Sequence, residues 1–171
     1  MMGRHPSPVV FFKHMTHHLV ELDWEFMNKC VNVVLTRDPF DMLTSFVNQI
    51  QEPKLSDTGY AAHHQVVKYL NTNQLPVIVL DGKNVLLNPK KVLSELCNKT
   101  GIPFKESMLK WEAGPRPEDG IWAKNWYHNV HKSTGFAPYK SKNVEMAENL
   151  KQLYEECLPH YQELKKMAIQ P

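Results

Sequence analysis

The sequence has few of the features that mark specialised classes of protein. Its 171 residues include only three cysteines, Cys30, Cys97 and Cys157, which are widely spaced and form no Cys-x-x-Cys motif. Because no secretory-leader pattern accompanies them, we expect free thiols and a cytoplasmic protein. No apolar run approaches the roughly 18 residues of a membrane span, and the net charge of +2 is small. We therefore predict neither a membrane nor a nucleic acid as a partner.

Two kinds of binding motif are missing as well. The sequence has no Gly-x-x-x-x-Gly-Lys-Ser/Thr loop for phosphate, and Gly82-Lys83-Asn84, which lacks an earlier partner glycine, is interpreted as a turn after a strand. His14, His17 and His18 offer imidazoles and Glu21 offers a carboxylate, but nothing nearby completes a set of metal ligands. No metal is predicted.

The composition is that of an ordinary folded chain, because 42% of the residues are hydrophobic and 22% are charged. The length suits one domain over 1–171. Strands and helices alternate without a linker or a repeat, which favours an α/β fold with a parallel sheet. The sequence predicts a strand at 76–81, a helix that Asp57 begins, a helix from Asn88 to Gly101 and a closing helix at 144–167.

The segment 31–46 is the most informative part of the chain. The apolar run from Val31 to Leu35 indicates a strand that is covered on both faces. Asp38 and Pro39 are typical of the start of a helix. Arg37 is thereby placed at the carboxyl end of a strand, where open α/β sheets bind their ligands.

Arg37 and Ser45 could bind one phosphate together. The guanidinium offers a fixed fork of donors, and the hydroxyl adds another donor from the helix. Ser45 lies away from the apolar stripe of that helix. The alternative is that Arg37 pairs with Asp38 or Asp41 and that Ser45 is simply solvated. The spacing leaves both interpretations open.

The stretch from 108 to 139 holds further candidates for the same ligand, because an irregular loop of that length is usually functional or disordered. Arg116 and Lys124 would add charge-assisted contacts to a phosphate, with Asn125 beside them. Gly120 would let the backbone approach closely. Trp122 and the neighbouring aromatic residues could stack a base or could cap the hydrophobic core.

These segments together resemble the P-loop sulfotransferase superfamily. The strand with Arg37, Asp38 and Pro39, followed by Ser45, resembles the segment that holds the 3′-phosphate of 3′-phosphoadenosine 5′-phosphosulfate (PAPS). The stretch 120–126 resembles, with one extra residue, the Gly-x-Trp-Lys-Asn loop that closes over the nucleotide. Residues 9–15 look like the strand that ends in a lysine near the transferred group. The likeness spans residues 8–165 and extends to the N-terminal region of plant branched-chain-aminotransferase-like proteins.

The resemblance implies a three-layer parallel sheet and the transfer of a sulfuryl group from PAPS, as co-substrate, to a small-molecule hydroxyl or amine acceptor. Lys13 would stabilise charge on the leaving phosphate, and His14 or His17 would take the proton of the acceptor. The nucleotide would be bound by Arg37, Ser45, Arg116, Gly120, Trp122, Lys124 and Asn125.

Two departures from the family pattern change what is expected. Met15 stands where the better-known cytosolic members have a catalytic histidine, two residues beyond the lysine. The P-loop strand is absent from the sequence, so we interpret the domain as incomplete at its N-terminus. The alternative to an enzyme is a non-catalytic fragment or isoform that binds a nucleotide or a protein. Exposed strand edges at 9–12 and 31–35 would then favour self-association.

Overall fold

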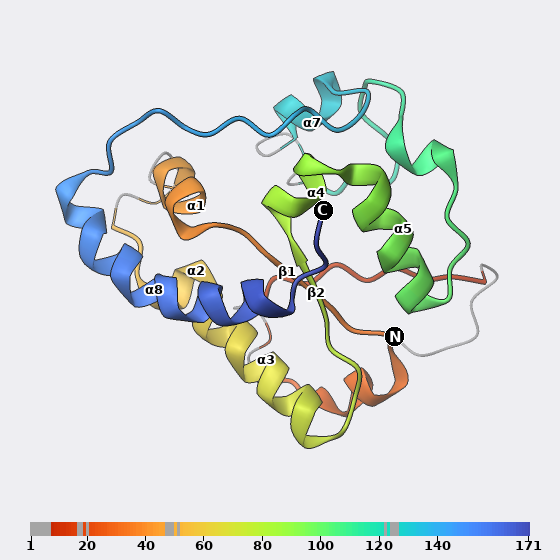
Figure 1. The fold of residues 1–171 in the computed structure, drawn as a ribbon, viewed down its shortest axis with the longest axis horizontal. Helices are drawn as coiled ribbons and strands as arrows, with labels where there is room; N and C mark the ends of the chain where they lie inside the picture. The colour runs from red at the N-terminus through yellow and green to blue at the C-terminus, as the bar shows by residue number, and fades with distance from the viewer. Residues whose placement is uncertain are drawn as a thin grey trace.

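The computed structural model describes residues 8–16, 19, 21–46, 50, 52–121, 123 and 127–171. In this part of the chain, two short strands run parallel at the centre, and helices surround them (Figure 1). The strands are β1 (Val33–Thr36) and β2 (Ile78–Asp81), and their pairing runs from Val33 opposite Ile78 to Thr36 opposite Asp81. The protein is therefore α/β with a small parallel sheet.

The helices alternate with the strands along the chain. They are α1 (Pro39–Phe46), α2 (Leu55–Thr58), α3 (Tyr60–Thr72), α4 (Gly82–Leu87), α5 (Pro89–Thr100), α7 (His128–Lys132) and α8 (Glu148–Met167), with 3₁₀ helices at Trp24–Lys29 and Glu106–Leu109. Among the described residues, no helix combines the length and the apolar character that crossing a bilayer requires.

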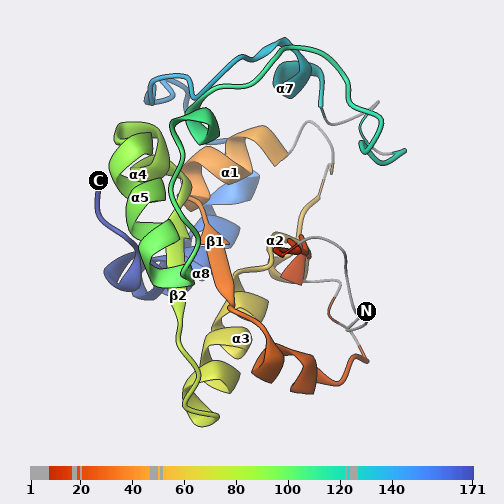
Figure 2. The same cartoon turned by 90° about the vertical axis from the view of Figure 1, so that its right-hand side faces the viewer.

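Helices α3 and α8 cover one face of the sheet. Val34 of β1 and Val79 of β2 lie in one buried cluster with Leu70 of α3 and Leu164 of α8. Figures 1 and 2 show α5 on the other side of the strands. Burial of this apolar area is the main source of the stability that holds the two strand ends in place.

β1 is covered on one face only, so the prediction of a strand buried on both faces was wrong. Leu80 of β2 packs against Val92 of α5, and β2 is buried along its whole length. Val33 and Leu35 of β1 face the same side as Leu80 but remain 37% and 60% exposed. The reason is that α5 packs over β2 and leaves β1 open on that side.

The strand expected at 9–15 is also absent, because residues 8–16 have no strand pairing. Their side chains are largely exposed, and Phe11 is 84% exposed. A strand forms by pairing its backbone with another strand, and among the described residues no strand pairs with this segment. Lys13 therefore lies on extended chain rather than at the tip of a strand.

Local capping accounts for the helix ends that sequence reasoning found. The Asp38 side chain accepts a hydrogen bond from the Phe40 N–H at 2.9 Å at the start of α1, and Asn88 accepts one from the Lys91 N–H at 3.1 Å at the start of α5. The helix expected from Asp57 begins differently, because Gly59 with φ of 78° separates α2 from α3. A left-handed residue of this kind ends one helix and lets the chain turn into the next.

Gly82-Lys83-Asn84, interpreted from the sequence as a turn after a strand, forms the first turn of α4 directly after β2. The Asp81 side chain accepts a hydrogen bond from the Lys83 N–H at 2.7 Å and so caps this helix. The Asn84 side chain donates to the Ile169 carbonyl at 2.9 Å, which fastens α4 to the C-terminal residues.

Candidate anion-binding site

The two strands deliver charged side chains to one edge of the sheet. β1 ends at Thr36 and β2 at Asp81, and these two residues are register partners, so both chains leave the sheet at the same level. Arg37 follows β1, and Lys83 follows β2. This edge is where open α/β sheets bind ligands.

The backbone at Arg37 is held by a buried tyrosine. The Tyr60 hydroxyl donates a hydrogen bond to the Arg37 carbonyl at 2.6 Å, and Tyr60 is buried in the cluster between α1, α3 and α8. Burial raises the pKa of Tyr60 far above its usual range, so the phenol stays protonated and remains a donor. The strand end is thus fixed while the Arg37 side chain stays exposed.

Lys142 completes a cluster of polar groups on α1. It belongs to the extended segment between α7 and α8, which passes over α1 (Figure 1). Its ammonium donates hydrogen bonds to the Asp41 carbonyl at 2.8 Å, to Thr44 Oγ1 at 2.9 Å and to Ser45 Oγ. The structure therefore places the ammonium of Lys142 beside Ser45 of α1.

The charge of Lys142 is influenced by burial and by two nearby charged residues. Burial lowers the pKa of Lys142, the nearby charge of Arg37 lowers it further, and Asp41 opposes both effects. Lys142 is thus under the electrostatic influence of Arg37, which lies between β1 and α1. An exposed guanidinium and an ammonium beside hydroxyl groups near one strand end are suited to binding phosphate.

The nearby carboxylates have partners other than Arg37. Asp38 caps α1, and Asp41 accepts a hydrogen bond from the Tyr139 hydroxyl at 3.1 Å. Within the residues that the structure describes, no ion pair joins Arg37 to either carboxylate. The local ion pair of Arg37 with Asp38 or Asp41, which the sequence left open, is therefore not present among the described residues.

Lys83 lies close to the same group of residues. Its ammonium is 4.9 Å from the centroid of the Tyr139 ring, within the range of a cation–π contact. Burial raises the pKa of Tyr139, and its hydrogen bond to Asp41 raises it further, so this phenol also remains a donor. Tyr139 thereby connects the residue after β2 with α1, which follows β1.

Lys13 lies apart from this cluster, beside the late loop. Its ammonium is 5.8 Å from the centroid of the Tyr127 ring. The ring of His14 lies between aromatic neighbours, with centroids 6.5 Å from Phe12 and 6.2 Å from Phe26. The structure thus places Lys13 next to the segment that sequence reasoning assigned to the nucleotide.

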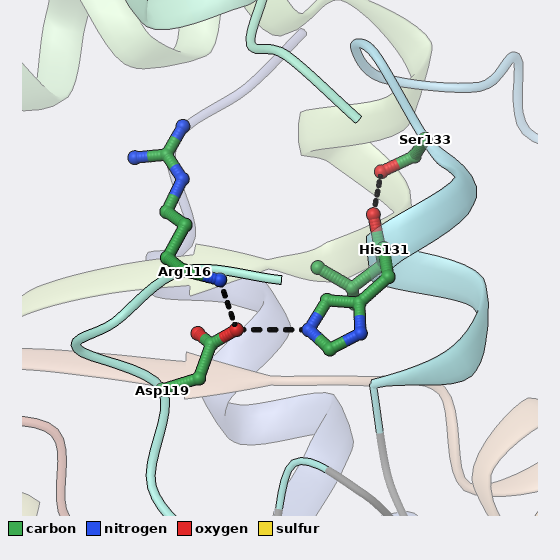
Figure 3. A network of polar contacts seen from close by, with 5 residues as sticks. Arg116, Asp119, His131 and Ser133 are labelled. Atoms are coloured by element: carbon green, nitrogen blue, oxygen red, sulfur yellow. Dashed lines mark hydrogen bonds and ion pairs between the residues drawn. The ribbon is translucent and has the colours of Figure 1, made fainter. Parts of the chain in front are cut away.

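Arg116 and Gly120 lie in that late loop. The guanidinium of Arg116 is exposed and points away from the loop's own Asp119 (Figure 3). In the described ranges, no hydrogen bond or ion pair connects Arg116 or Gly120 with Arg37. The other residues predicted for the site, His17, Trp122, Lys124 and Asn125, lie outside the described residues.

A histidine and a carboxylate form a pair in the same loop. His131 Nε2 lies 2.8 Å from Asp119 Oδ2, and the Arg116 N–H donates to the same oxygen at 2.9 Å (Figure 3). The backbone hydrogen bond lowers the pKa of Asp119, and the bond to His131 lowers it further. A carboxylate on one ring nitrogen orients the imidazole and leaves the other nitrogen for proton transfer.

Sequence reasoning missed both Lys142 and the pair of Asp119 with His131. Lys142 lies 97 residues from Ser45, and no local pattern joins such distant positions. Asp119 and His131 are 12 residues apart in an irregular loop, where no helical or strand period predicts a contact. Across the described residues, no group of three or more His, Cys, Asp or Glu side chains is placed to hold a metal ion.

Comparisons with known proteins identify a family and two plant relatives. A family model described as a sulfotransferase domain matches residues 1–168. Branched-chain-amino-acid aminotransferase-like protein 2 of Arabidopsis thaliana is 36% identical over 152 residues, and branched-chain-amino-acid aminotransferase-like protein 1 of the same plant is 35% identical over 152 residues. Each alignment covers 88% of this chain but only 27% of the relative, so the chain spans about a quarter of the length of these curated relatives. No solved structure matches significantly.

Proposed function

The chain belongs to the sulfotransferase-domain family, and from this premise we propose that it binds PAPS and transfers the sulfuryl group to a hydroxyl or amine acceptor. The contact of Lys142 with Ser45 on α1, the helix that follows Arg37, carries the proposal. A guanidinium, an ammonium and hydroxyl groups at the carboxyl end of a strand favour a phosphate as ligand. We assign this cluster to the 3′-phosphate of the nucleotide.

The late loop is proposed to close over the rest of the nucleotide. Arg116 supports this role, because its guanidinium points away from the loop's own carboxylate (Figure 3). Gly120 would allow close approach of the backbone. Trp122, Lys124 and Asn125 are assigned to the same contact by the family resemblance alone.

The reaction we propose is an in-line displacement at sulfur. The acceptor oxygen or nitrogen forms a bond to sulfur while the bond from sulfur to the 5′-phosphate oxygen breaks, and adenosine 3′,5′-bisphosphate leaves. Lys13 would stabilise the charge that develops on the leaving phosphate, and a histidine would take the proton of the acceptor. His14 and His17 are the candidates from sequence. His131, oriented by Asp119 and close to Tyr127 beside Lys13, is a third.

We further propose that residues 1–171 form one domain with the three-layer sheet of P-loop sulfotransferases. The arrangement of β1 and β2, with α5 on one side and α3 and α8 on the other, supports this architecture. A parallel strand such as β2, buried between helices on both faces, is typical of such folds.

Isothermal calorimetry with adenosine 3′,5′-bisphosphate tests the assignment of the phosphate site. We expect Arg37→Ala to weaken binding by roughly 1.5–3 kcal/mol, because a charge-assisted contact is lost. Lys68→Ala on α3 is the matched control, because Lys68 is also exposed but lies on a helix that covers the far face of the sheet. Equal affinity of the wild type and Arg37→Ala would refute the site.

Transfer itself is tested with radiolabelled PAPS and a panel of hydroxyl and amine acceptors. Labelled product from the wild type, reduced in Arg37→Ala, supports a transferase. Binding of the nucleotide without any labelled product would instead favour the non-catalytic alternative, a module that binds a nucleotide.

A further inference from the structure

We propose that Lys142 is a positioning residue of the phosphate site, which sets the Ser45 hydroxyl as a donor to the 3′-phosphate and adds a second positive charge beside Arg37. The inference rests on the proposed function, because it assigns a role within the same site. It adds a residue that neither the sequence pattern nor the family resemblance identified.

The geometry of the ammonium explains how it would set the hydroxyl. Lys142 directs hydrogen bonds to three oxygens of α1, which belong to Asp41, Thr44 and Ser45. An ammonium can only donate, so the Ser45 oxygen accepts in this contact. The hydroxyl hydrogen of Ser45 is thereby turned away from Lys142.

In the structure this hydrogen is directed at a backbone acceptor. Ser45 Oγ donates to the Asp41 carbonyl at 3.2 Å, and the same carbonyl accepts from Lys142 at the shorter distance of 2.8 Å. The carbonyl would keep its Lys142 bond if Ser45 turned to a phosphate oxygen. The turn would therefore not leave the Asp41 carbonyl without a donor, and so avoids the cost of an unpaired carbonyl.

The segment that carries Lys142 also engages the negative charge of the helix. Tyr139, three residues earlier, donates to the Asp41 carboxylate at 3.1 Å. A hydrogen-bonded carboxylate has part of its charge offset, so it repels a nearby phosphate less. Tyr139 and Lys142, from one extended segment, thus both donate hydrogen bonds to residues of α1. Arg37 follows the end of β1.

The positive charges of Arg37 and Lys142 give the ligand a further gain. Burial lowers the pKa of Lys142 and the charge of Arg37 lowers it further, which indicates repulsion between the two charges. A phosphate monoester carries close to two negative charges near neutral pH and would relieve this repulsion. The site would therefore distinguish a nucleotide with a 3′-phosphate from one with a 3′-hydroxyl.

The experiment compares two nucleotides on a small set of variants. Calorimetry with adenosine 3′,5′-bisphosphate and with adenosine 5′-phosphate is run on the wild type, Lys142→Gln, Lys142→Arg and Lys140→Ala. Gln keeps a donor toward α1 without the charge, and Arg keeps the charge. Lys140 is the matched control, because it is an exposed lysine on the same segment.

We expect Lys142→Gln to weaken binding of the bisphosphate by about tenfold or more and to leave adenosine 5′-phosphate unchanged. Lys142→Arg should recover part of the loss, and Lys140→Ala should match the wild type. In combination with Ser45→Ala, the loss from Lys142→Gln should be smaller than in the wild type, because the two side chains act through one contact. A thermal melt of each variant confirms that it is folded.

The opposite outcomes are equally clear. An equal loss of affinity for both nucleotides would mean that Lys142 only stabilises the fold, and it would overturn the inference. The inference would also be overturned if Lys142→Gln bound the bisphosphate as tightly as the wild type while Arg37→Ala bound it more weakly. That result would still support the proposed function. If the wild type does not prefer the bisphosphate, the proposed function fails and the inference fails with it.

Discussion

Two buried phenols hold the ends of the two strands. The Tyr60 hydroxyl donates to the Arg37 carbonyl at 2.6 Å, and the Tyr161 hydroxyl donates to the Asp81 carboxylate at 2.7 Å. Burial raises the pKa of both phenols, so both are protonated at neutral pH and act as donors. These two hydrogen bonds hold the strand ends from which Arg37 and Lys83 follow.

Hydrogen bonds from its own loop shift the pKa of Asp119. The Arg116 N–H and His131 both stabilise its charged form, so its pKa lies below the ordinary value of 3.8. The pKa of Asp119 is lower in the folded state than in the unfolded state. Its charged carboxylate therefore stabilises the folded protein at pH values above the unfolded-state pKa, and this stabilisation is lost as the pH falls through the folded-state pKa. A carbon-detected NMR titration of the Asp119 carboxyl should give a midpoint below 3.8.

His131→Ala should raise that midpoint only in part, because the Arg116 N–H is the larger cause and remains in place. Lys132→Ala serves as the control, because Lys132 is exposed on the same short helix and does not contact the carboxylate. A midpoint at the ordinary value in the wild type would show that the loop does not hold the pair in solution.

At the scale of elements, Asp81 joins β2 to α4. Its carboxylate accepts from the Lys83 N–H and from the Tyr161 hydroxyl, and it is fully buried. We expect Asp81→Ala to lower the free energy of unfolding by about 2–4 kcal/mol, since a helix cap is lost and a buried hydroxyl loses its acceptor. Urea denaturation measures this change.

Two further variants separate these contributions. Asn88→Ala removes an exposed cap of α5 and should cost only about 1 kcal/mol. Tyr161→Phe combined with Asp81→Ala should cost less than the sum of the single changes, because no hydroxyl is then left unpaired. Strict additivity would indicate that the hydroxyl of Tyr161 finds another acceptor.

These elements also show what the sequence could and could not predict. Asp38, Asn88 and Gly101 act through residues close to them in the chain, so the ends of α1 and α5 were predictable from local chemistry. The absence of a strand at 9–15 was not predictable, because a strand also depends on a distant neighbour that hydropathy does not reveal. Arg37 was predictable as a candidate from its place at a strand end and Ser45 from helix phase, whereas Lys142 reaches Ser45 only through tertiary folding.

At the scale of the whole molecule, one side of the sheet stays apolar and open. In the described part of the chain, the sheet has two strands, and β1 forms its edge. Val33 and Leu35 of β1 lie on the side that α5 leaves open and are exposed, and Val31 just before the strand is exposed as well. In Figure 2, no further strand of the described residues lies beside β1. Exposed apolar strands with unpaired backbone groups are places where chains associate.

We propose that the chain self-associates through this edge of β1. Sedimentation velocity over a range of micromolar concentrations should show species larger than the monomer. Leu35→Lys should shift the distribution toward the monomer, because an exposed charge on an edge strand opposes pairing with another strand. Leu87→Lys is the matched control, since Leu87 is 53% exposed, close to the 60% of Leu35, but ends α4 rather than lying on the sheet. If the wild type sediments as a monomer at all concentrations and melts in one cooperative transition, the edge is covered in solution. In that case another part of the chain would have to cover β1 in solution, and residues 8–16 would have to lie elsewhere than in this structure if they formed that cover.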